Sequence, residues 1–183
     1  MTATALVPIA NGSEDIETVT IIDILRRAGV DTLVASVHDQ PEITAARDTR
    51  ITADGVLEEC LDQDYDLIAL PGGPGAKHLR DCAPLIDALK QQRDRGGWYA
   101  AICAAPAVVL AHHGLLDGLK ATAFPDVQED LPDRSRADER VVTDGHCITS
   151  QGPGTALEFS LMLVEKLCGK VKRDEIESRL VMP

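Results

Sequence analysis

A cysteine stands where a strand-like apolar run meets a helix-like run, in the segment Trp98–Leu110 (WYAAICAAPAVVL). Cys103 precedes Pro106, and proline is favoured in the first turn of a helix. We therefore expect the thiol at a helix start, where unpaired backbone N–H groups favour an anion. A free thiol with a pKa of about 8.5 is about 3% ionised at neutral pH, whereas cysteines at helix starts reach pKa values of about 3.5–7.5. The segment predicts either a reactive thiolate or a small buried hydrophobe, which is a common role of free cysteine.

The same turn is similar to the strand–nucleophile–helix elbow of hydrolases, with sulfur in place of oxygen. Ala104 and Ala105 stand where a flanking glycine is usual. A second turn, Leu70–Ala76 (LPGGPGA), carries glycines that let backbone approach closely. The amides of Gly72 and Gly73 could point at an anion or a carbonyl oxygen, or the glycines could only form a tight turn. The segment has neither a dinucleotide-binding glycine pattern nor a phosphate-binding loop with lysine.

Glu17 is the third residue that could take part in chemistry, within Asn11–Val19 (NGSEDIETV). If a helix begins near Asp15, Glu17 shares a stripe with apolar residues four, seven and eleven positions further on. Burial there would raise its pKa and favour a protonated acid that donates a hydrogen bond to a thiolate or passes a proton. The alternative is an exposed glutamate that complements the helix dipole.

Histidines do not supply a base that the sequence can place beside the cysteine. His112 and His113 lie about 14 Å further along the predicted helix, and His38, His78 and His146 cannot be positioned from the sequence. The cysteines are scattered, with neither a C-x-x-C pair nor zinc-ligand spacing, so we expect no disulfide framework and no metal site. They are Cys60, Cys82, Cys103, Cys147 and Cys168.

The elements that must position these residues alternate between strand-like and helix-like runs. Strands are expected at 5–10, 31–37, near 51, 65–73, 98–102, 140–144 and 146–152, and helices at 15–29, 84–95, 106–114, 155–169 and 173–181. Thr155 and Glu158 have the spacing of a capping box. This alternation predicts a mostly parallel sheet with helices on both faces, whose site lies at the carboxyl ends of the strands. The turn Gly152–Gly154 is expected to serve packing.

Composition narrows the classes of function. The chain has 183 residues, enough for one domain, and 44% of them are hydrophobic. Its net charge of -12 disfavours nucleic acid and anionic membrane surfaces as partners. No apolar segment is long enough to span a bilayer and the first residues lack signal-peptide features, so we expect a cytoplasmic protein.

Five blocks, AAICAAP, LPGG, GSEDIETV, RRAG and SQGPGTALEF, resemble the signatures of the ThiJ/PfpI superfamily in family order. The chain is most similar to the Parkinson's-associated protein deglycase branch and its YajL-like bacterial members. The resemblance implies one ThiJ/PfpI (class I glutamine amidotransferase-like) domain over residues 1–183. It also implies a flavodoxin-like three-layer α/β sandwich with a cysteine nucleophile elbow, no cofactor, and a homodimer.

The resemblance also assigns roles to six residues. Cys103 becomes the oxidisable nucleophile and Glu17 the protonated acid that hydrogen-bonds it. Gly73 and Ala104 supply oxyanion-hole amides. The final pair, Arg27 and Arg47, match family arginines that hold anions near the cysteine and the dimer interface.

Two positions depart from the family. Protease-like members have a histidine directly after the cysteine, where this chain has Ala104, which argues against peptidase activity. Human-type members have a histidine where this chain has Phe124, which cannot transfer protons. Any glyoxalase-type reaction would then depend on Cys103 and Glu17 alone.

Three hypotheses follow for the function. The first is an enzyme of glyoxalase III or deglycase type acting on methylglyoxal, glyoxal or their early adducts. The second is a stress-responsive redox sensor or holdase chaperone without turnover, whose Cys103 oxidises to the sulfinic acid. The third is a family member with an unreactive thiol.

Overall fold

The central feature of the computed structural model, which describes residues 2–182, is a seven-stranded sheet in the order β5-β2-β1-β6-β7-β9-β8. All neighbouring strands are parallel except β8 and β9, which form an antiparallel pair at one edge. The strands are β1 (Thr4–Ile9), β2 (Asp31–Ser36), β5 (Gly55–Val56), β6 (Leu67–Leu70), β7 (Trp98–Ile102), β8 (Val141–Asp144) and β9 (Cys147–Ser150).

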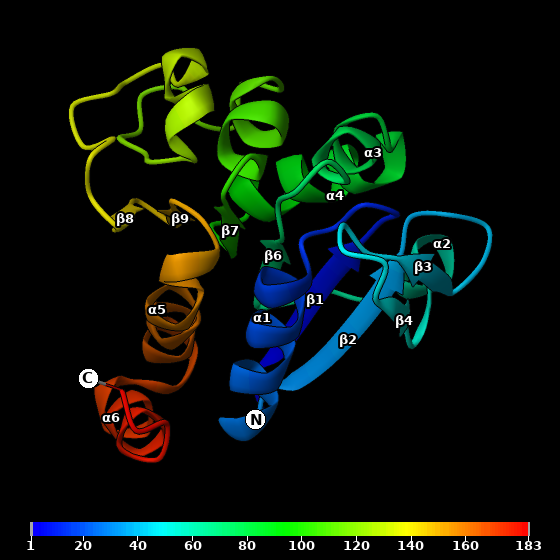
Figure 1. The fold of residues 1–183 in the computed structure, drawn as a ribbon, viewed down its shortest axis with the longest axis horizontal. Helices are drawn as coiled ribbons and strands as arrows, with labels where there is room; N and C mark the ends of the chain where they lie inside the picture. Colours follow the sequence, from blue (N-terminus) through cyan, green and yellow to red (C-terminus); the bar gives the residue numbers. More distant parts are fainter. Residues whose placement is uncertain (1, 183) are drawn as a thin grey trace.

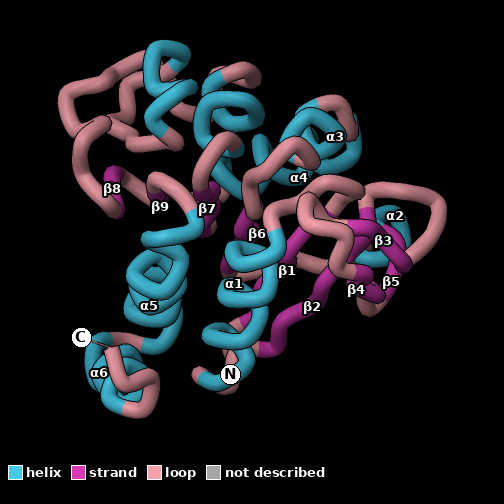
Figure 2. Tube along the Cα trace, in the orientation of Figure 1, coloured by secondary structure: helices cyan, strands magenta, loops and turns pink. Residues whose placement is uncertain are grey.

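Helices pack on both faces of this sheet, which gives three layers (Figures 1 and 2). One face carries α1 (Asp15–Arg27), α5 (Ala156–Cys168) and α6 (Lys170–Ser178). The other carries α2 (Leu57–Cys60), α3 (Ala76–Arg80), α4 (Ala83–Asp94) and the π-helical segment Pro106–Ala111. Figure 1 shows α1 and α5 side by side, with the C-terminus near α6. Two 3₁₀ turns, Pro125–Asp130 and Pro153–Thr155, complete the helical segments.

Alternation along the strands explains why both faces are covered. In β1, Ala5, Val7 and Ile9 pack toward α1 and α5, while Leu6 packs toward the opposite layer. A parallel strand buried on both sides must be apolar throughout, as the continuous run in β6 also is. The predicted α/β sandwich with a mostly parallel sheet is therefore confirmed.

Some elements differ from the sequence-based prediction. The expected short strand near Ile51 is β4 (Arg50–Thr52), and it pairs with a strand that was not predicted, β3 (Glu42–Thr44), in a separate hairpin. The helix expected at 106–114 is a shorter π-helix, in which the His112 amide donates to the carbonyl of Ala107.

The predicted capping box at the start of α5 is wrong. The Thr155 hydroxyl bonds to Ser150 and to the Gly152 backbone, and Glu158 pairs with Arg140 through several N–H···O contacts of 2.8–3.0 Å. Glu158 pairs with Arg140 instead of a backbone amide because the guanidinium forms stronger, charge-assisted hydrogen bonds.

Strand order also determines where a site can form. The chain leaves β1 toward β2 on one side and resumes at β6 on the other, so the loops after β1 and β6 diverge at a topological switch point. The loop after β1 leads into α1, and the loop after β6 carries Gly72 and Gly73. The neighbouring strand β7 ends at Ile102, directly before Cys103, so the three predicted chemical segments come together at the carboxyl ends of the central strands.

Candidate active site

Cys103 occupies a strained backbone position directly after β7. Its φ angle is 65°, in the left-handed region that residues other than glycine rarely adopt. Its amide donates to the carbonyl of Ser150 at 2.9 Å, and its carbonyl accepts from the Phe124 amide at 2.7 Å. These bonds to flanking segments hold the strained conformation in place. The residue is 7% exposed, and the backbone amides of Gly73 and Ala104 act on its thiol by lowering the pKa.

Gly72 allows the turn after β6 to lie against the cysteine. A Cβ atom at this position would stand 2.6 Å from the Cys103 Cβ and 2.8 Å from the carbonyl oxygen of Ile102. Gly73 has a φ angle of 80°, and a Cβ there would lie 2.7 Å from the Glu14 amide nitrogen. The glycines thus serve as expected for close backbone approach, with Gly73 facing the sulfur.

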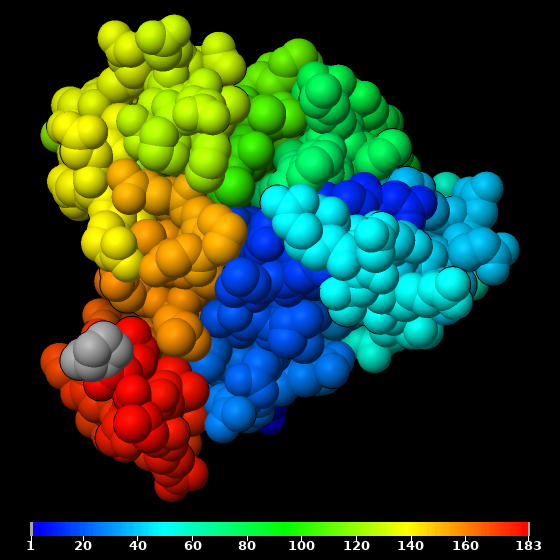
Figure 3. Space-filling view, viewed as in Figure 1, coloured from blue at the N-terminus to red at the C-terminus, as the bar shows by residue number. Residues whose placement is uncertain are grey.

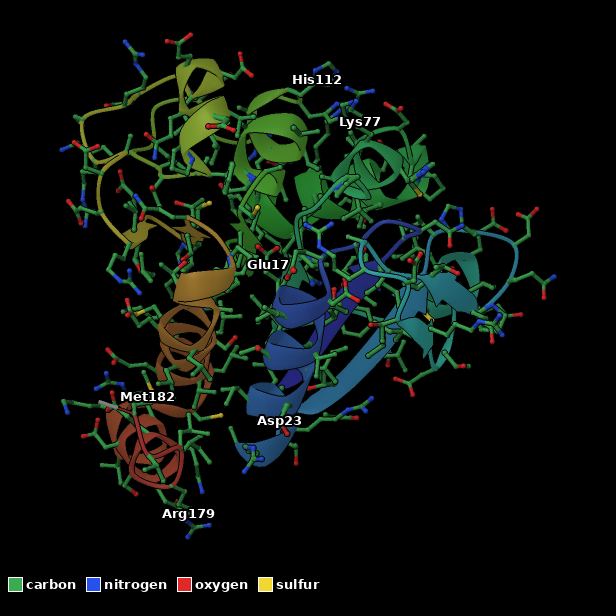
Figure 4. The ribbon with its side chains drawn as sticks, viewed as in Figure 1. Glu17, Asp23, Lys77, His112, Arg179 and Met182 are labelled. Atoms are coloured by element: carbon green, nitrogen blue, oxygen red, sulfur yellow. The ribbon has the colours of Figure 1, made fainter. Side chains whose placement is uncertain are left out.

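Glu17 lies in the first turn of α1 and is fully buried (Figure 4). The apolar stripe that it shares, Ile21, Ile24 and Ala28, is also buried, so the alternative of an exposed dipole-complementing glutamate is wrong. Its Oε2 atom accepts from the Gly72 amide at 2.8 Å, while its Oε1 atom has no hydrogen-bond partner among the described residues. A buried oxygen without a donor is costly, unless the oxygen itself carries a proton that it can donate.

Electrostatics couple this carboxyl group to the thiol. Burial raises the pKa of Glu17 to about 7, against the opposing Gly72 amide and Cys103 contact. Burial also raises the pKa of Cys103, and the charge of an ionised Glu17 raises it further, while the Gly73 and Ala104 amides oppose both effects. Such a pair loses its protons in two separate steps.

These directions correct one prediction from the sequence. A depressed thiol pKa was expected from a position at a helix start, whereas burial and Glu17 raise it. The helix that follows is only six residues long, and the amides that contact the sulfur belong to Gly73 and to the elbow itself. A thiolate therefore forms most readily while Glu17 keeps its proton, because the repulsion between two charges is then absent.

The two arginines lie in different places. Arg47 is exposed on the loop beside the start of α1, where its amide donates to Asp15 Oδ2 at 2.9 Å. Arg27 ends α1 and pairs with Asp23 at 2.6 Å. Arg27 follows Glu17 by ten positions, which is about 15 Å along the helix, so Arg27 does not join the cysteine cluster within this chain. Figure 4 shows Glu17 and Asp23 well separated along α1.

Phe124 is the aromatic neighbour of the elbow, linked to Cys103 by the backbone bond and 37% exposed. The histidines make contacts elsewhere. His38 accepts from the Asn11 amide, and His113 contacts the carbonyl of Arg80. The ring pairs His38–His78, His112–His113 and Trp98–His146 meet edge to face. The groups that shift the Cys103 pKa are Glu17, Gly73 and Ala104.

Sequence reasoning missed Glu14. This residue caps α1, and its Oε2 atom accepts from the Glu17 amide at 2.8 Å. The spacing of three residues between Glu14 and Glu17 is the signal that could have identified it, because an N-cap side chain bonds to the third helical amide.

Two broader observations concern residues 2–182. Within them, His, Cys, Asp and Glu side chains form no group of three or more that could hold a metal ion. None of the helices described there combines the length and apolarity that crossing a membrane would require.

Comparison with known proteins gives consistent matches. The family model described as "DJ-1/PfpI family" matches residues 3–166. Protein DJ-1 homolog B of Arabidopsis thaliana is 48% identical over 168 residues, covering 91% of this chain, although this chain spans only 38% of that relative's length. The glutathione-independent glyoxalase DJR-1.2 of Caenorhabditis elegans is 36% identical, covering 90% of this chain and 88% of that protein. The solved structure of oxidized Toxoplasma gondii DJ-1 superposes with a TM-score of 0.96 at 44% identity, covering 98% of each chain.

Proposed function

Because this chain belongs to the DJ-1/PfpI family, we propose that it is a cofactor-independent enzyme of glyoxalase III or deglycase type acting on methylglyoxal, glyoxal or their early adducts. The observation that carries this proposal is the buried cluster in which a carboxyl group with a raised pKa and two backbone amides adjoin one sulfur atom. The name of the C. elegans relative supports the same reaction class.

In the proposed mechanism, the Cys103 sulfur attacks the aldehyde carbon of methylglyoxal. A carbon–sulfur bond forms, the carbonyl electron pair moves to oxygen, and Glu17 delivers its proton to that oxygen to give a hemithioacetal. The Gly73 and Ala104 amides stabilise the negative charge that develops on the oxygen. The Glu17 carboxylate then removes the proton from the former aldehyde carbon and returns it to the adjacent carbon, while the proton of the new hydroxyl group passes to the former ketone oxygen, which yields a thioester. Water hydrolyses the thioester to the 2-hydroxy acid and the thiol, and return of the thiol proton to the Glu17 carboxylate restores the thiolate and the protonated acid.

Turnover of methylglyoxal by the purified protein tests this proposal. We expect consumption of methylglyoxal with stoichiometric formation of lactate, and loss of this activity in Cys103→Ala. Cys147→Ala is a matched control, since that thiol is fully buried elsewhere in the molecule and takes no part in the mechanism. Equal rates for the wild-type protein and Cys103→Ala would refute the proposal.

A second candidate is a redox sensor or redox-regulated holdase chaperone, in which two equivalents of hydrogen peroxide oxidise the Cys103 thiol to the sulfinic acid and are reduced to water. The partnerless Glu17 Oε1 favours it, because a protonated oxygen there could donate to a sulfinate oxygen. The solved relative from Toxoplasma gondii is described as oxidized. Intact-mass measurement after mild peroxide treatment should show two added oxygens confined to Cys103, and dispersed oxidation over several cysteines would contradict this reading.

Two further properties are part of the proposal. We propose that the chain forms a homodimer, supported by the exposed apolar side chains of Ile16 and Val19 on α1, a helix that lies open on the face shown in Figure 3. Light scattering should then give twice the chain mass of 19.6 kDa. We propose a cytoplasmic location, since the five cysteines are free thiols, as is usual in a reducing compartment.

A further inference from the structure

Glu14 contacts the two segments that lie beside the Cys103 sulfur, namely the start of α1 and the turn after β6. Its side-chain Oε2 atom accepts from the Glu17 amide at 2.8 Å, and its own amide donates to the carbonyl of Gly72 at 3.1 Å. The Gly72 amide in turn donates to Glu17 Oε2 at 2.8 Å. Glu14, Gly72 and Glu17 thus form a closed circuit of three hydrogen bonds that links the start of α1 to the turn after β6.

The same residue borders the amide that contacts the sulfur from this turn. A Cβ atom at Gly73 would lie 2.7 Å from the Glu14 nitrogen and 3.1 Å from the Glu14 Cβ atom, so the two backbones are in direct contact. Movement of Glu14 would therefore displace the carboxyl group of Glu17 and the amide of Gly73 together.

From this geometry we propose that Glu14 is a positioning residue, which sets Glu17 and the Gly73 amide relative to the Cys103 sulfur and whose charge favours the protonated form of Glu17. The effect of Glu14 on turnover rests on the proposed function, whereas its effect on the ionisation of the Glu17–Cys103 pair does not. Glu14 does not touch the sulfur in this arrangement; it acts through the two groups that do.

The negative charge of Glu14 disfavours ionisation of Glu17. Glu14 is half-buried beside the fully buried Glu17, and a neighbouring negative charge disfavours ionisation of a carboxyl group. The pKa of Glu17 is raised first by burial and also by the charge of Glu14. The groups that oppose it are the Gly72 amide and the Cys103 side chain. Asp15 lies in the same turn, but its carboxylate accepts from the Arg47 amide.

Two substitutions separate the charge from the cap. Glu14→Gln keeps an oxygen that can accept from the Glu17 amide and removes only the charge, while Glu14→Ala removes both. Asp15→Asn is the matched control, because it removes a first-turn charge that does not face Glu17. The readouts are the ionisation of Glu17, followed by the infrared carbonyl band of the protonated acid, and the pH midpoint of Cys103 alkylation by iodoacetamide.

We expect Glu14→Gln to retain the fold and to lower the pKa of Glu17, so that the protonated fraction of Glu17 at pH 7 falls by about twofold or more. Because an ionised Glu17 repels the thiolate, the alkylation midpoint of Cys103 should then move to higher pH. Glu14→Ala should in addition lower the melting temperature, and Asp15→Asn should leave the Glu17 band unchanged. Equal titrations of Glu17 in the wild-type protein and Glu14→Gln would overturn the role of the charge. Unchanged alkylation in Glu14→Ala would overturn the positioning role.

These outcomes do not depend on turnover. If wild-type protein fails to convert methylglyoxal, the proposed function fails, yet the infrared titration and the alkylation profile still decide whether Glu14 controls the pair.

Discussion

Replacing Glu17 by glutamine should move the reactivity of Cys103 to higher pH. In the wild-type protein the thiol and the carboxyl group share a buried site, and the first proton leaves the pair near the raised Glu17 pKa of about 7. While Glu17 keeps its proton, it can donate a hydrogen bond to a thiolate, which the Gly73 and Ala104 amides also stabilise. Glutamine keeps only a neutral amide at this position, so in Glu17→Gln the thiolate loses the hydrogen bond from the carboxylic acid.

The size of the change follows from the two acids. An isolated thiol has a pKa of 9.0, and burial raises this value at Cys103. Because the neutral amide of glutamine is a weaker donor to a thiolate than a carboxylic acid, Glu17→Gln should raise the Cys103 midpoint by about one pH unit. A rise of one unit lowers the thiolate fraction about tenfold at any pH below the midpoint, so alkylation at pH 7 should slow by about tenfold.

The assay is the rate of iodoacetamide labelling of Cys103 between pH 5 and 10, measured by peptide mass spectrometry. Cys168 is exposed in the same molecule and serves as an internal control, because its labelling profile should be identical in both proteins. A Glu17→Gln midpoint that equals or falls below the wild-type midpoint would refute the shared-proton reasoning. Such a result would mean that Glu17 acts on the thiol mainly as a repelling charge.

Three other predictions follow from the same contacts. The folded state binds the Glu17 proton more tightly than the unfolded chain does, so the free energy of unfolding of the wild-type protein should fall as pH rises from 4.5 to about 7. Glu17→Gln lacks this proton, so urea unfolding should show its stability rising by about 3 kcal/mol relative to wild type between pH 4.5 and pH 8. Gly72→Ala should lower the free energy of unfolding by about 3 kcal/mol or more and abolish selective Cys103 labelling, because its Cβ would lie 2.6 Å from the Cys103 Cβ. Gly29→Ala is the control, because no atom lies within 4 Å of its Cβ. Its φ angle of 79° should lower the free energy of unfolding by only about 1 kcal/mol and leave labelling intact. Phe124→His should add an ionisation near pH 6.5 to the pH profile of methylglyoxal turnover, and a profile without that limb would show that the side chain at this position does not reach the reacting atoms.

The sequence predicted best where a physical signal is repeated along the chain. The apolar runs of β1, β6 and β7 and the amphipathic pattern of α1 locate the ends of those elements within three residues, because each buries several side chains with a regular period. The hairpin of β3 and β4 has three residues in each strand and one fully buried apolar side chain, Ile43, which is too short for any period to be visible.

The ionisation of Cys103 could not be predicted in the same way, because its causes are distant in the sequence. The local sequence predicts that Cys103 lies at a helix start, where its anion would be stabilised. The folded chain instead buries the sulfur and sets against it a carboxyl group from α1, while a glycine turn after β6 supplies one amide to each of the two groups. The spacing within NGSEDIETV indicates that Glu17 turns inward, but not that its proton is the one on which the thiolate depends. That dependence arises only when the strand order brings the carboxyl ends of β1, β6 and β7 together. The reactivity of this cysteine therefore depends on the loops at that end of the sheet and not on the elbow alone.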